Sequence, residues 1–486
     1  MFRLKNINRQ AFYAAVISAI SVISTAHADS MLPKDVQKTC AVSSNEFNSW
    51  FVEGKPTAQG WVKPANSVDF TTNNTVCDFY KWGAQMFLWL TSPEGDGLVL
   101  DGEAIINVLP ADDQGKRYLQ KNRDGVALPF SLRREKFDDI GEVGQAGGSG
   151  VLMSQGKSLV YYGVHINNVY AYFLTGQKTG KFPDMKKFPR NNDDLQDVEK
   201  FVASNYPNTW LVAKEALVME LKSSWVEAST LSNPEDFIQM NAVIPTYTPN
   251  SNNTTWKKTS TKPAKLALVG MHVVGTVQNH PEFVWSSFEH INNAPDAKYY
   301  YYNSKRKLQK TSYSSAGNFV FMASGGSENS ANTECMKEDK GDINAVESNG
   351  KAVCGGGVVP SNTVRVNPWG SAPTAASATN NTLLLSNNNS IINQLSNGDL
   401  RKNYIQIGGI WTSAPTETSD APIPDTNDFN STDLRGSLIL ANSTMETYNQ
   451  SLDCFTCHEQ SKTAPDSFQP FELSHIYSQI VPLPMK

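Results

Sequence analysis

The stretch Leu266-Ala-Leu-Val-Gly-Met-His272-Val-Val-Gly-Thr-Val277 and the nearby Glu282-Phe-Val-Trp-Ser-Ser-Phe-Glu-His290 decide the class of fold. Both are rich in β-branched and aromatic residues and short enough for single strands. On a regular strand, His272 shares a face with Leu266 and Leu268, as a core histidine does. Outward from this pair, similar composition predicts further strands at residues 97–100, 158–162, 213–226, 299–302, 318–323 and 404–411.

Helical periodicity occurs in fewer places. In residues 77–90 the apolar side chains recur at three- and four-residue spacing, which predicts a core helix. Shorter helices are expected at residues 45–51, 193–204, 390–395 and 442–448. The polar stretches 249–263 and 413–432 are interpreted as surface loops, and the Asn/Thr-rich stretch 372–389 as the best internal linker. The prediction is a mixed α+β fold, with a β-rich body and helical additions.

Composition sets broad limits on partners. The chain has 486 residues, of which 40% are hydrophobic, with a formal net charge of -5. Such a chain can bury a large core, and it lacks the basic excess that nucleic-acid binding requires. After the first thirty residues no apolar run is long enough to span a bilayer, so no transmembrane segment is expected in the mature chain.

The first 28 residues have the pattern of a cleavable signal peptide. Arg3, Lys5 and Arg9 precede an apolar stretch at residues 11–23, and Ala26-His27-Ala28 has the small-x-small form of a cleavage site. The apolar stretch is shorter than the roughly 20 residues of a membrane anchor, which is the rival interpretation. We expect cleavage after Ala28 and a periplasmic or secreted protein.

The sequence Cys454-Phe-Thr-Cys457-His458 carries the clearest chemistry. Cys-x-x-Cys-His is the attachment signature of c-type haem, in which the two thiols bind the macrocycle covalently and the histidine ligates the iron. A thioredoxin-type redox pair normally follows a strand in a βαβ unit, and a zinc site needs two more ligands where only His475 is near. We therefore expect one covalent haem c, and three parts: the signal peptide 1–28, the β-rich body 29–436 with N-terminal helices, and a short helical haem-binding segment 437–486.

The other four cysteines suit an oxidising compartment. The simplest pairing is Cys40–Cys77 and Cys335–Cys354, each local in sequence, although four cysteines allow three connectivities.

The second axial ligand decides the chemistry of such a haem. His475 is the first choice for the distal iron ligand, because the chain between it and His458 is long enough to pass around the edge of a haem. An open distal position stays an alternative. Less favoured ligands are Met485, Met445, His272 and His290. Arg401, Arg435 and Lys462 are candidates for binding the haem propionates, since arginine favours charge-assisted bonds to carboxylates.

Several segments in order resemble a family of uncharacterised, exported bacterial c-type cytochrome proteins with one C-terminal Cys-x-x-Cys-His motif. They are Leu268-Val-Gly-Met-His272, the stretch from His280 to His290, Leu440-Ala-Asn-Ser-Thr-Met-Glu-Thr-Tyr448, and the motif itself. The resemblance covers the middle and end of the chain. It implies an exported haem protein but no defined reaction.

Three functions follow as hypotheses. The first is electron transfer in a periplasmic redox system with an unidentified redox partner. The second is a haem enzyme, such as a peroxidase-like oxidoreductase, with an open distal site and His272 or His290 as acid/base. The third is a haem-based sensor of a small ligand. Whether the protein is an enzyme is left open at this stage.

Overall fold

The computed structural model describes residues 32–70, 75–121, 138–139, 142–182, 185, 187–278, 280–412, 434–459 and 473–485. The expected signal peptide, the loop 413–432 and Lys462 lie outside these residues.

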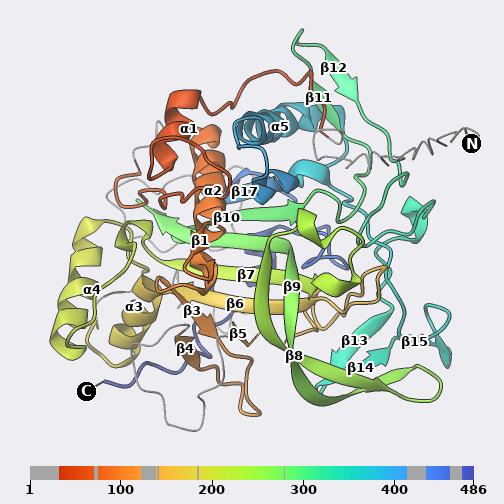
Figure 1. Ribbon diagram of the computed structural model, residues 1–486, viewed down its shortest axis with the longest axis horizontal. Helices are drawn as coiled ribbons and strands as arrows, with labels where there is room; N and C mark the ends of the chain where they lie inside the picture. The colour runs from red at the N-terminus through yellow and green to blue at the C-terminus, as the bar shows by residue number, and fades with distance from the viewer. Residues whose placement is uncertain are drawn as a thin grey trace, which may run out of the picture.

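One large sheet dominates the described chain (Figure 1). It has twelve strands, and its main path runs β18-β17-β10-β9-β7-β6-β3-β4. Neighbours on this path are antiparallel, while β5 and β8 pair in parallel. The strands of this sheet are β3 (Ile105–Val108), β4 (Leu119–Lys121), β5 (Asp138–Asp139), β6 (Tyr161–Asn167), β7 (Met219–Glu227), β8 (Gln239–Pro249), β9 (Thr255–Val277), β10 (His280–His290), β13 (Met336–Asp339), β14 (Asp342–Ala345), β17 (Tyr404–Thr412) and β18 (Leu434–Gly436).

Besides short 3-10 helices, the described residues contain six α-helices and three small hairpins. The helices are α1 (Ser44–Trp50), α2 (Val76–Leu90), α3 (Asn168–Lys178), α4 (Asn192–Asn205), α5 (Ala378–Ile392) and α6 (Cys454–Glu459). The hairpins pair β1 (Pro93–Glu94) with β2 (Gly97–Leu98), β11 (Tyr300–Tyr302) with β12 (Leu308–Lys310), and β15 (Glu347–Ser348) with β16 (Lys351–Ala352). The expected mixed α+β class is confirmed. None of the described helices is both long and apolar enough to cross a membrane.

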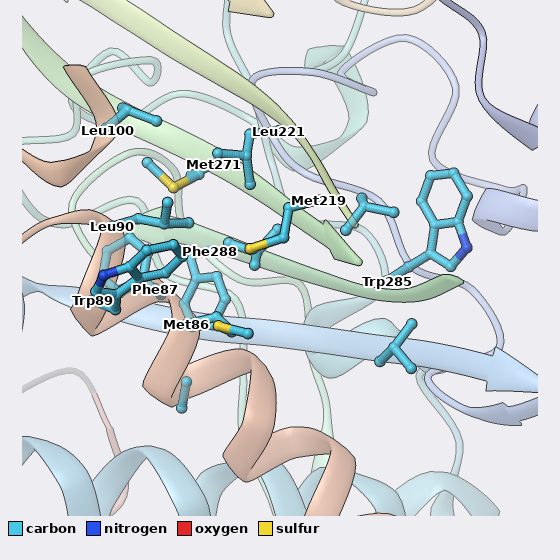
Figure 2. Close-up of a cluster of buried hydrophobic side chains, with 14 of the residues drawn as sticks. Met86, Phe87, Trp89, Leu90, Leu100, Met219, Leu221, Met271, Trp285 and Phe288 are labelled. Carbon is cyan, nitrogen blue, oxygen red and sulfur yellow. The ribbon is translucent and has the colours of Figure 1, made fainter. Parts of the chain in front are cut away.

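Helix α2 covers one face of the central sheet. Its start is fixed by Asp78, whose carboxylate accepts hydrogen bonds from the backbone N–H and the hydroxyl of Thr75. Phe87 then stacks on Phe288 of β10, with ring centroids 4.4 Å apart. Figure 2 shows this apolar cluster, in which Met219, Leu221 and Met271 of β7 and β9 contribute side chains on the same side. This face is the main hydrophobic core.

The opposite face of the central strands is polar and is covered by residues 437–459 and 473–485, which we call the C-terminal segment. On this face the strand positions are Glu220, Lys222 and Ser224 of β7, His272 and Gly270 of β9, and Trp285, Ser287 and Glu289 of β10. Asn442 donates from Nδ2 to Ser287 Oγ at 3.0 Å, and Ser443 donates from its backbone N–H to Glu289 at 2.6 Å. The C-terminal segment is therefore held by polar contacts rather than by apolar ones alone.

Two polar stretches proved to be regular structure. Residues 255–263 of the expected loop 249–263 belong to β9 and pair with β8; their side chains are largely exposed, so no apolar alternation marks them. The expected linker 372–389 contains most of α5, which is largely buried. There Asn387 and Asn388 donate to Gln406 of β17, so these amides serve the interior rather than solvent.

Three smaller expectations were wrong. Residues 318–323 form no strand, although Phe321 is buried. The strand expected from 213 begins at Met219, after a short 3-10 turn. Residues 442–448 form turns rather than a helix, because the side chain of Asn442 accepts from the backbone and hydroxyl of Thr444 and closes the chain locally.

Candidate functional site

The Cys454–His458 motif forms most of α6. Asp453 initiates the helix: its carboxylate accepts from the backbone N–H of Thr456 at 2.9 Å and from that residue's hydroxyl at 2.7 Å. One helical turn separates Cys454 from Cys457, so the two thiols lie on the same side of the helix. His458 follows directly, and its ring contacts Trp285 of β10 with centroids 4.3 Å apart.

The two motif cysteines are the free thiols of the described chain. The other four form the disulfides Cys40–Cys77 and Cys335–Cys354, which confirms the expected pairing. Cys454 and Cys457 are both partly exposed and are not joined to each other. The motif thiols are thus kept apart from the structural disulfides.

Burial keeps both motif thiols protonated. It raises the pKa of Cys454 well above its usual value, and the negative charge of Glu446 adds to the effect. The pKa of Cys457 is raised by the same two causes in the same order. A redox-active Cys-x-x-Cys pair has instead a thiol with a depressed pKa, so this environment disfavours thioredoxin-type chemistry.

His458 has a defined tautomer. Its Nδ1 lies 2.6 Å from the carbonyl oxygen of Leu473, and since a carbonyl only accepts, Nδ1 carries the proton. Burial, followed by the repulsion that protonated His458 and His475 would exert on each other, holds the pKa of His458 well below its usual value. The ring is therefore neutral at pH 7, and Nε2 is the nitrogen that carries the lone pair.

His475 lies directly against His458. The two rings stack with centroids 3.6 Å apart and an interplanar angle of 8°. The pKa of His475 is lowered to about 4, because the ring is buried and because the positive charge of Lys222 is near. The chain around His475 forms a turn, in which the hydroxyl of Ser474 accepts from the N–H groups of Ile476 and Tyr477.

The stacked arrangement is not itself an axial pair. Two axial ligands direct their ring nitrogens toward one iron from opposite sides, whereas these imidazoles meet face to face. The structure brings His475 to the motif but leaves its role as an iron ligand a prediction.

Polar groups of the sheet lie beneath the motif. His272 contacts Glu446 of the C-terminal segment, with Nε2 and Oε1 3.0 Å apart, and its Nδ1 is 3.1 Å from Ser287 Oγ. Burial alone would raise the pKa of Glu446, but the contact with His272, together with Lys222, lowers it overall. Glu446 is therefore a carboxylate, and its charge acts on both motif thiols.

The face on which His272 lies differs from the expected one. The pairing of β7 with β9 shifts between Ser224 and Trp225, so that Gly270 pairs with Ser224 but Leu268 pairs with Trp225. This β-bulge at Val269 places Leu266 and Leu268 on the α2 side and His272 on the polar side. His272 is hence a bonded site residue rather than a member of the apolar core.

Other expected candidates lie away from the motif or in packing roles. His290 stacks on Phe237 with centroids 3.8 Å apart, and its Nε2 is 3.3 Å from the carbonyl oxygen of Asp236. Met445 is buried in an apolar cluster, and Met485 is 41% exposed near the terminus.

Two of the three expected propionate cations, Arg401 and Arg435, lie in the described residues, and both bond to groups outside the motif. Arg401 is buried and donates to both carboxylate oxygens of Asp399 and to the carbonyl of Leu88, which commits its guanidinium. Arg435 is exposed on β18 and donates to the carbonyl of Leu434.

Four residues of the site were missed by the sequence analysis: Trp285, Lys222, Glu220 and Glu446. The signal for Lys222 and Glu220 was a pair of charges that alternate with the apolar residues Met219 and Leu221 at the start of a strand. Trp285 gave no signal, since an aromatic residue on a strand is ordinary core.

In the described residues, no group of three or more His, Cys, Asp or Glu side chains is arranged to hold a metal ion. Comparison with known proteins finds no matching family model, no matching curated sequence and no matching solved structure.

Proposed function

We propose that the chain is an exported c-type haem protein whose haem is bound covalently by Cys454 and Cys457 and ligated by His458. The observation that carries the proposal is the Cys-x-x-Cys-His sequence with two unpaired thiols, in a chain whose other cysteines are joined in disulfides. Export, by the N-terminal 28 residues, belongs to the same proposal, because c-type haem is attached after export.

The residues at the motif fit a haem. The thiols stand one turn apart on α6, as attachment to two neighbouring vinyl groups requires. His458 donates from Nδ1 to the carbonyl oxygen of Leu473, which orients the ring and directs its lone pair from Nε2. Bound there, the haem would supply one-electron chemistry at its iron.

Electron transfer is the function we favour. A second neutral imidazole, that of His475, lies within contact distance of His458. Two strong axial ligands favour electron transfer over ligand binding. We propose that His475 would be the second residue to hold the iron, which requires its ring to leave the stack on His458.

The test is expression in a host that attaches haem c, followed by purification of the mature protein. We expect a coloured protein whose mass exceeds that of the mature polypeptide by one haem, with the added mass on the peptide that contains Cys454 and Cys457. The C454A/C457A variant should be colourless. A control variant, C335A/C354A, removes a disulfide but should keep the haem. A colourless wild-type protein would refute the proposal.

A haem enzyme is the second candidate, favoured by the His272–Glu446 pair. A histidine hydrogen-bonded to a carboxylate is a typical proton-transfer pair, and this one acts on the motif through its charge. If the protein turns over peroxide, His272→Gln should lower kcat by about 10²-fold or more. A haem-loaded wild type that shows no peroxide turnover excludes this candidate.

A further inference from the structure

Trp285 has a buried donor without an acceptor. The residue is 5% exposed, and among the described residues its indole Nε1 has no hydrogen-bond partner. Leaving a buried donor unpaired costs about 1–3 kcal/mol, so such groups in folded proteins nearly always have a partner. An acceptor of another kind is therefore expected at this position.

The neighbours of Trp285 indicate which acceptor its indole N–H would meet. Its ring meets the ring of His458 edge to face with centroids 4.3 Å apart, and it meets Phe455 of the motif helix at 6.0 Å. The register of β10 places Trp285 on the same side of the sheet as Ser287, which pairs with His272, and Figure 2 shows its indole at the far end of the buried cluster from Trp89. The donor thus lies beside the residue that we propose to ligate the haem iron.

A haem offers one class of strong acceptor at its edge, its two propionate carboxylates. An indole N–H donates only, and a hydrogen bond to an ionised carboxylate is stronger than one to a neutral acceptor. The arginine considered for this purpose from the body, Arg401, is already bonded to Asp399. Among the described residues, Arg401 is therefore not free to bind a propionate, whereas the indole N–H of Trp285 is.

We propose that the indole Nε1–H of Trp285 donates a hydrogen bond to a haem propionate. The inference rests on the proposed function. It assigns Trp285 a role as a cofactor-binding residue, in addition to its packing against His458. Because a hydrogen bond to the charged form lowers the pKa of an acid, the bond holds that propionate ionised at lower pH.

The test compares haem-loaded wild type with Trp285→Phe. Phenylalanine keeps an aromatic ring and removes the donor. We expect the haem to stay attached in the variant, while the propionate bending band in the resonance Raman spectrum shifts. The pH at which the midpoint potential changes slope should rise by about one unit, the size of one lost charge-assisted bond.

Trp225→Phe is the matched control. Trp225 is also buried in the central sheet, but it lies on the α2 side and its Nε1 donates to Ser223 Oγ at 2.7 Å. This change should leave both the Raman band and the potential profile as in wild type.

A measurement on unaltered Trp285 covers the case in which Trp285→Phe fails to fold. The indole N–H resonance of Trp285, in 15N-labelled protein, should move downfield in the haem-loaded form relative to C454A/C457A. Haem-loaded protein with an unchanged propionate band in Trp285→Phe, or an unmoved indole resonance, overturns the inference. Protein without attached haem overturns the proposed function instead.

Discussion

At the scale of single residues, the site is defined by neutral imidazoles and protonated thiols. His458 and His475 both have lowered pKa values, chiefly because both rings are buried. A neutral imidazole is the form that binds a metal ion, so neither ring has to lose a proton at pH 7.

The role of His475 is tested by His475→Ala in the haem-loaded protein. If His475 is the second axial ligand, removing it should convert a low-spin optical spectrum into a high-spin one that binds cyanide or carbon monoxide. Met485→Leu, a change at an exposed terminal residue, should leave the spectrum unaltered. A low-spin spectrum in His475→Ala would exclude His475 as the ligand.

Glu220 provides a prediction about pH. Burial raises its pKa to about 7, against the opposing hydrogen bonds from Ser474 and Tyr170. Since the folded pKa lies above the unfolded one, ionisation of Glu220 opposes folding increasingly from about pH 4.5 to above pH 7. Glu220→Gln should therefore raise the melting temperature at pH 8, by about 2 °C, with the gain fading toward pH 5.

A calorimetric or circular dichroism melt at both pH values measures this difference. An equal gain at pH 5 and pH 8 would show that the effect comes from packing and not from the carboxyl group.

At the scale of elements, the central sheet packs differently on its two faces. On the α2 side, Gly83 lies so close to β10 that an added Cβ would stand 2.4 Å from Ser286 Oγ. On the polar side, a Cβ on Gly270 would stand 2.6 Å from Thr444 Oγ1 of the C-terminal segment. Both glycines permit close approach, one of a helix and the other of the segment that carries the motif.

Substitutions at these two glycines test the stability of the fold and the packing of the C-terminal segment separately. Gly83→Ala and Gly270→Ala should each lower the free energy of unfolding by about 1–3 kcal/mol, as overpacking does. Only Gly270→Ala should also speed protease cleavage within the C-terminal segment under native conditions, because it displaces Thr444. Equal cleavage rates in the two variants would contradict this division.

At the scale of the whole molecule, the N-terminal region, the sheet and the C-terminal segment share one core. Phe47 of α1, Phe288 of β10 and Ile480 near the end of the described chain belong to the same buried cluster. The disulfide Cys40–Cys77 lies in the N-terminal region, whereas Cys335–Cys354 closes a loop that contains the hairpin of β13 and β14.

The cysteine assignment predicts a thiol count. Denatured, unreduced protein should show two reactive thiols without haem and none with it. Each disulfide should contribute about 2–4 kcal/mol to stability, and Cys40–Cys77 roughly 0.6 kcal/mol more, since its separation of 37 residues is about twice the 19 of the other. Four reactive thiols in haem-free protein would contradict the pairing.

The sequence revealed those features whose signal is local. The composition of β10 and β17, the periodicity of α2 and the order of the four disulfide cysteines all lie within short stretches, and the structure agrees with each of them. The exposed half of β9 and the buried amides of α5 were missed because their stabilising partners lie elsewhere in the chain.

The same limit applies to the site. The motif is a local pattern, whereas Trp285 and Lys222 reach it only through the pairing of strands distant in sequence. No sequence pattern predicts that Lys222, Trp285 and His458 lie close together, because they are far apart in the chain.

Val269 is the extra residue of the β-bulge in β9, and the alternation of side chains shifts by one position there. After Val269, the even-numbered side chains face the motif; before it, the odd-numbered ones do. Deleting Val269 would make Leu268 and Gly270 direct neighbours on opposite faces, so the alternation would become regular and each half of the strand would keep its present face. The deletion would remove only the side chain of Val269, which lies in the same buried cluster as Met445 of the C-terminal segment. The inserted residue therefore supplies an additional apolar anchor for that segment without turning His272 away from it.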